Sequence, residues 1–84
     1  MDKPEFNLEH QYQLYLERVG LRDKLMPPKM ETELRRAFFG ACGQLLILLR
    51  DDVGELTEDE GFKVFEDLLE QVSNFWLVET KRVN

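Results

Sequence analysis

The segment from Pro28 to Val53 constrains the fold of this chain more than any other feature. It opens with a proline, which suits the first turn of a helix, and it stops before Gly54, a residue type that often ends helices. Apolar residues recur along one face at helical spacing: Met30, Leu34, Ala37, Ala41, Leu45 and Leu48. Others lie elsewhere around the same helix: Phe39, Cys42, Leu46 and Ile47. Because a helix that is apolar on nearly all sides is buried on nearly all sides, we predict a long, buried helix over 28–53.

Two further helices are predicted, one on each side of this segment. Asn7 is a favourable N-cap and Gly20 a favourable stop, so a short helix is expected over 7–19. Thr57 and Glu60 have the spacing of a capping box, in which each side chain accepts a hydrogen bond from the other residue's backbone N–H. A wide apolar stripe follows them, made of Phe65, Leu68, Leu69, Val72, Phe75 and Trp76. This pattern predicts a third helix over 57–79.

These helices predict an all-α fold in one domain over 1–84. The connection between the two longer helices is short, so we expect them to pack as an antiparallel hairpin with the shorter N-terminal helix lying across them. A chain of 84 residues buries only about 60 to 65% of the surface that its unfolded form exposes. Contact with a partner would add burial, and we therefore expect a homodimer or a higher oligomer.

Composition and charge exclude several classes of protein. A net charge of -6 argues against general nucleic-acid binding, which needs a basic surface. The longest nearly apolar run, 37–49, is shorter than the roughly 20 residues that span a bilayer, and no signal peptide is recognised. The single cysteine, Cys42, cannot form an internal disulfide. We expect a cytoplasmic protein that does not bind membranes.

Residues 51–70 concentrate negative charge, with nine acids against Lys63 alone. Part of this run could form an acidic patch: Asp51, Asp52, Glu55, Glu58 and Asp59. The patch is either a solvated helix end or a functional surface that docks a basic partner or imitates the charge of a nucleic acid. It lacks the glycine and glutamate positions of a calcium loop, so no metal is expected. The single histidine, His10, has no nucleophile nearby in sequence, and the chain shows no catalytic set. We expect no enzyme and no cofactor.

A second stripe on the segment 28–53 is the strongest candidate for a binding surface. It consists of Arg36, Phe39, Gly43, Leu46 and Arg50, spaced like the seam of a coiled coil. Gly40 and Gly43 each cost about 1 kcal/mol relative to alanine inside a helix, which suggests that a backbone or a ligand approaches there. Either the N-terminal helix or the connection after it covers this stripe, or the stripe is a surface for a second subunit or a foreign partner. An antiparallel crossing of two copies at Gly43 would also gather arginines, with Arg35 beside them, and these would need acids of the neighbouring subunit or an anionic ligand.

Two stretches, 11–18 and 36–46, give the chain a resemblance. The chain resembles small helical accessory proteins of prophages and other mobile elements in these two stretches, Gln11-Tyr12-Gln13-Leu14-Tyr15-Leu16-Glu17-Arg18 and Arg36-Ala37-Phe38-Phe39-Gly40-Ala41-Cys42-Gly43-Gln44-Leu45-Leu46. The resemblance implies an accessory or inhibitory role, through binding a host protein or sequestering a host signal. Two hypotheses follow: an oligomeric interaction protein, or a sponge that holds a phosphate-containing small molecule at a subunit interface.

Overall fold

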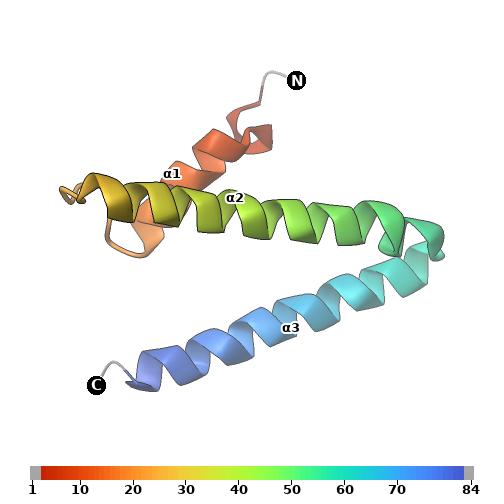
Figure 1. Cartoon of the computed structure of the whole chain (residues 1–84). Helices are drawn as coiled ribbons and strands as arrows, with labels where there is room; N and C mark the ends of the chain where they lie inside the picture. The colour runs from red at the N-terminus through yellow and green to blue at the C-terminus, as the bar shows by residue number, and fades with distance from the viewer. Residues whose placement is uncertain (1–2, 83–84) are drawn as a thin grey trace. The chain divides into compact units, whose positions relative to one another are not determined.

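A computed structural model describes residues 3–82, and within that range every regular element is a helix (Figure 1). A short turn of 3-10 helix, η1 (Pro4–Phe6), precedes α1 (Leu8–Arg18). The long helix α2 (Pro28–Asp51) is followed by the 3-10 turn η2 (Val53–Glu55) and by the long helix α3 (Glu58–Arg82). This confirms the all-α class with one short and two long helices. The predicted start of α2 is confirmed, and the other five predicted ends differ by one to three residues, as is usual where helices fray or tighten into 3-10 turns.

The chain divides into two compact units, Met1–Leu45 and Leu46–Asn84. The first contains α1 and most of α2, and the second contains the end of α2, η2 and α3. Each unit is described by itself below. The expected antiparallel packing of the two long helices stays a prediction.

Both ends of α1 are formed as the sequence predicts. The Asn7 side-chain oxygen accepts a hydrogen bond of 3.0 Å from the His10 backbone N–H, which satisfies one donor of the first turn. At the other end Gly20 has a φ of 75°. The Leu21 N–H donates to the Leu16 carbonyl at 2.8 Å and the Gly20 N–H to the Glu17 carbonyl at 3.2 Å. This pair of bonds is a Schellman motif, which needs a left-handed residue where Gly20 stands.

Replacing Gly20 with alanine should destabilise the N-terminal unit by about 1 kcal/mol, because a β-carbon is disfavoured at this positive φ. Asparagine tolerates the left-handed region better, so Gly20→Asn should lose less than Gly20→Ala. Urea denaturation of the two variants beside the wild type measures the difference. Equal stability of Gly20→Ala and wild type would contradict the Schellman end.

The core of the first unit forms where α1 packs across α2 (Figure 1). Tyr12 and Leu16 of α1 are the only buried apolar residues of the described chain, with 1% and 5% of their surface exposed. The ring of Tyr12 lies 5.2 Å from that of Phe38 and 6.1 Å from that of Phe39, centroid to centroid. Aromatic pairs at these separations add attraction beyond the burial of their area. The aromatic residues of α2 therefore hold α1.

The expectation that α2 is buried on nearly all sides is wrong for this chain by itself. No residue of α2 is buried, and Met30 and Leu45 of the predicted core stripe are 43% and 47% exposed. The physical reason is that α1, an 11-residue helix, is the only helix that packs on α2 within this unit. One short helix covers one side of a long one, and the bulky Phe38 and Phe39 occupy that side.

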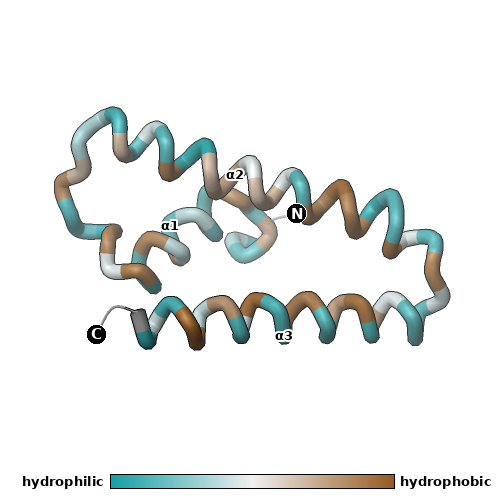
Figure 2. The backbone as a smooth tube through the Cα atoms, turned by 60° about the horizontal axis from the view of Figure 1, so that its bottom comes forward, coloured by the Kyte–Doolittle hydropathy of each residue, from teal (hydrophilic) through white to brown (hydrophobic). Residues whose placement is uncertain are grey.

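The second unit begins α3 with the predicted capping box. The Thr57 N–H donates to Glu60 Oε1 at 3.0 Å, and the Glu60 N–H donates to Thr57 Oγ1 at 3.2 Å. Gly61 lies against Val53 of η2, where a β-carbon would meet Val53 Cγ1 at 3.4 Å. Beyond this start, apolar residues recur along α3 at helical spacing, with polar residues between them (Figure 2). None of the described side chains of α3 is buried.

Candidate binding surfaces

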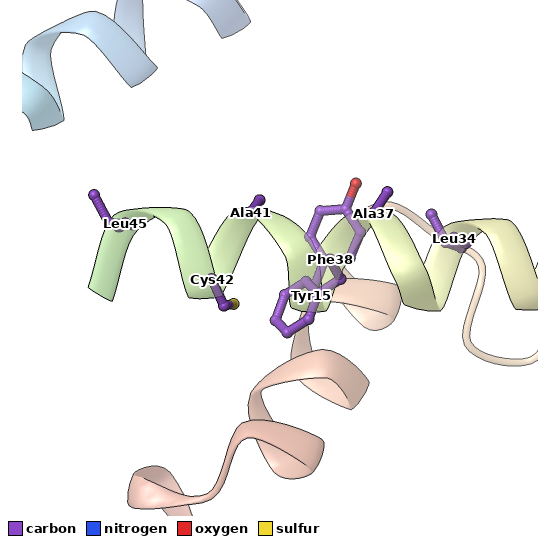
Figure 3. Close-up of a pocket in the computed structure, with 7 residues that line it drawn as sticks. All are labelled: Tyr15, Leu34, Ala37, Phe38, Ala41, Cys42 and Leu45. Atoms are coloured by element: carbon purple, nitrogen blue, oxygen red, sulfur yellow. The ribbon is translucent and has the colours of Figure 1, made fainter. Parts of the chain in front are cut away.

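An apolar groove of about 330 Å³ lies in the first unit, beside the contact between α1 and α2 (Figure 3). Tyr15 of α1 and six residues of α2 line it: Leu34, Ala37, Phe38, Ala41, Cys42 and Leu45. The volume is at the lower end of the range for small-molecule pockets. Because the lining offers almost only carbon, apart from the Tyr15 hydroxyl and the Cys42 thiol, the groove suits an apolar ligand or the side chains of another helix.

Sequence reasoning assigned four of these groove residues to the core, namely Leu34, Ala37, Ala41 and Leu45, and it did not single out Phe38. Their helical spacing correctly identified one apolar face of α2. The pattern could not show that α1 lies to one side of that face. A signal was present in the length of the helices, because an 11-residue helix cannot cover a 24-residue helix that is apolar around its circumference.

The predicted second stripe on α2 is covered at Phe39, whereas Arg36, Leu46 and Arg50 are exposed. Phe39 packs on the ring of Tyr12, with 6.1 Å between centroids. Leu46 is 51% exposed, and Arg50 beyond it is exposed too. Of the two alternatives left open by the sequence, covering by the N-terminal helix therefore holds for the Phe39 end. The Leu46 end stays available to a second subunit.

The side-chain positions of the two glycines of α2 face open space within residues 3–82. A β-carbon built on Gly40 or Gly43 would meet nothing within 4 Å. The close approach that these glycines suggested is therefore not made by another part of the described chain. Any backbone or ligand that approaches them comes from outside it.

Two of the three arginines proposed to hold an anion already have carboxylates of their own chain. Arg35 Nη2 donates to Glu9 Oε2 at 3.3 Å, Arg35 Nη1 donates to the other oxygen, and the Arg35 guanidinium lies 4.6 Å above the ring of Tyr12. Arg50 Nε donates to Asp51 Oδ1 at 2.7 Å. These hydrogen bonds hold the pKa of Glu9 and that of Asp51 below their ordinary values. Both pairs are exposed, so they contribute little to stability.

Arg36 differs from these two arginines. It is exposed and makes no ion pair with any residue of the described range 3–82. The sequence suggested that Asp51 and Asp52 of a neighbouring subunit could neutralise the arginine cluster. Asp51 pairs with Arg50 of its own chain, whereas Asp52 is exposed and forms no ion pair within residues 3–82. Within residues 3–82, Arg36 is therefore the one guanidinium of the predicted set that forms no ion pair.

The predicted acidic patch is exposed throughout and lies in the second unit, around η2 and the first turn of α3. All five members are exposed: Asp51, Asp52, Glu55, Glu58 and Asp59. In the part of the chain that the structure describes, only Asp51 pairs with a basic side chain, and no group of three ligating residues is placed to hold a metal ion. The patch can attract a basic surface.

Comparisons with protein-family models, with curated proteins and with solved structures find no match to this chain. What the molecule does must therefore be inferred from its own surfaces. Among residues 3–82, no helix combines the length and the apolar character that crossing a membrane requires.

Acid should weaken the start of α3. Glu60 accepts hydrogen bonds from the Thr57 N–H and from Thr57 Oγ1, and these lower the pKa of Glu60 below its ordinary 4.5. A carboxyl whose pKa is lowered by folding stabilises the folded state above its unfolded pKa, and this contribution is lost as the pH falls through the folded value. Stability should therefore decline below about pH 4.5, and the lowered pKa values of Glu9 and Asp51 act in the same direction.

Urea denaturation of wild type and Glu60→Gln at a series of acidic pH values tests this. The amide oxygen of glutamine still accepts a hydrogen bond but carries no charge, so the variant should show a weaker pH dependence than wild type. Glu58→Gln is the matched control, because Glu58 lies on the same helix turn and makes no hydrogen bond through its side chain within the described residues. The same change of slope in both variants would contradict a specific role of Glu60.

Proposed function

We propose that this chain is a non-enzymatic helical interaction protein that associates with copies of itself and binds a host protein. One observation carries the proposal: two apolar residues of the described chain are buried, whereas seventeen large ones are exposed. Soluble monomers rarely expose contiguous apolar patches larger than a few hundred Å². Such patches mark surfaces that are covered in the working assembly.

The exposed apolar residues are not scattered singly. On α2 they cluster at Leu45, Leu46 and Ile47, of which Leu45 lines the groove, and on α3 they recur over most of the helix. Burying apolar surface contributes roughly 25 cal/mol per Å², so covering two such faces gives association a substantial driving force. The same faces offer no acid, base and nucleophile set, which supports a binding role rather than catalysis.

Light scattering coupled to size exclusion, at micromolar concentration, tests self-association. We expect a single species at a multiple of the 10.0 kDa chain mass. Gln44→Lys, an exposed polar position on α2, serves as a control and should leave the mass unchanged. A monodisperse species of 10.0 kDa would overturn the proposal.

The acidic patch leads us to expect that the host partner has a basic surface. Its members are exposed, and carboxylates on a surface accelerate association with a positively charged protein. The resemblance to prophage accessory proteins suggests a bacterial cytoplasmic partner and an inhibitory outcome. Replacing Glu55, Glu58 and Asp59 by their amides should slow association with such a partner and weaken its dependence on salt. An unchanged salt dependence of association would contradict a role of the acidic patch in binding the partner.

Arg36 favours a second candidate, a sponge for a phosphate-containing small molecule at a subunit interface. An arginine beside an apolar surface without a counter-charge is suited to binding a phosphate, which it can contact through two N–H groups. Calorimetric titration of wild type and Arg36→Ala with linear and cyclic nucleotides separates the two candidates. Binding heat that disappears in Arg36→Ala would favour the sponge, and no heat from any nucleotide would favour the protein partner.

A further inference from the structure

We draw no further inference here: the strongest candidate, the apolar groove of the first unit that is lined by Tyr15 of α1 and by one face of α2, carries nothing further because nothing in the structure shows what covers it.

Discussion

Tyr12→Ala is expected to unfold the N-terminal unit, whereas Tyr12→Phe should leave its stability unchanged or raise it. Tyr12 is 1% exposed, and it is the largest side chain that the described part of the chain buries fully. Its ring contacts those of Phe38 and Phe39. Truncating a buried aromatic side chain to alanine costs about 3–5 kcal/mol, which is comparable to the whole stability of a small domain.

The phenylalanine variant isolates the hydroxyl. The Tyr12 hydroxyl oxygen is buried and has no hydrogen-bond partner among residues 3–82. A buried polar group without a partner costs about 1–3 kcal/mol, so its removal should not destabilise the unit. Urea denaturation followed by far-ultraviolet circular dichroism measures both variants, with Tyr15→Phe in the groove as the control. A loss of stability in Tyr12→Phe beyond about 1 kcal/mol would show that the hydroxyl finds a partner in solution.

Phe39→Glu should impair folding, whereas Leu46→Glu should leave folding intact and can change only assembly, although both residues belong to the same predicted stripe. Phe39 packs on the core aromatics, with ring centroids 6.1 Å from Tyr12 and 5.6 Å from Phe38. A carboxylate forced among these rings has no counter-charge and should cost about 3 kcal/mol or more. Leu46 is 51% exposed, and a glutamate there reaches water in the single chain.

Circular dichroism and light scattering distinguish the two effects. Phe39→Glu should lose helix content and thermal stability, whereas Leu46→Glu should keep both. Any change of mass in Leu46→Glu therefore reports on assembly alone, and Gln44→Glu, an exposed position on the same helix, is its control. If Phe39→Glu folded as well as wild type, the packing of α1 on the Phe39 end of the stripe would be incorrect.

The sequence by itself determined the features that depend on neighbouring residues. The cap at Asn7, the stop at Gly20 and the capping box of Thr57 and Glu60 are all present as predicted. Each involves groups only a few positions apart, so its energy depends on local spacing and hardly on the rest of the fold. The type and approximate length of all three α-helices follow from the same local signals together with helical periodicity.

Only the tertiary structure decided which apolar face is covered. Periodicity identifies the faces of α2 but gives no information on where α1 lies, because that depends on how side chains far apart in sequence fit together. The bulky Phe38 and Phe39 fit around Tyr12, so α1 packs there, and the smaller residues of the expected core stripe line an open groove instead. The pairing of Arg35 with Glu9, 26 residues away, has the same origin and removed one arginine from the predicted anion site.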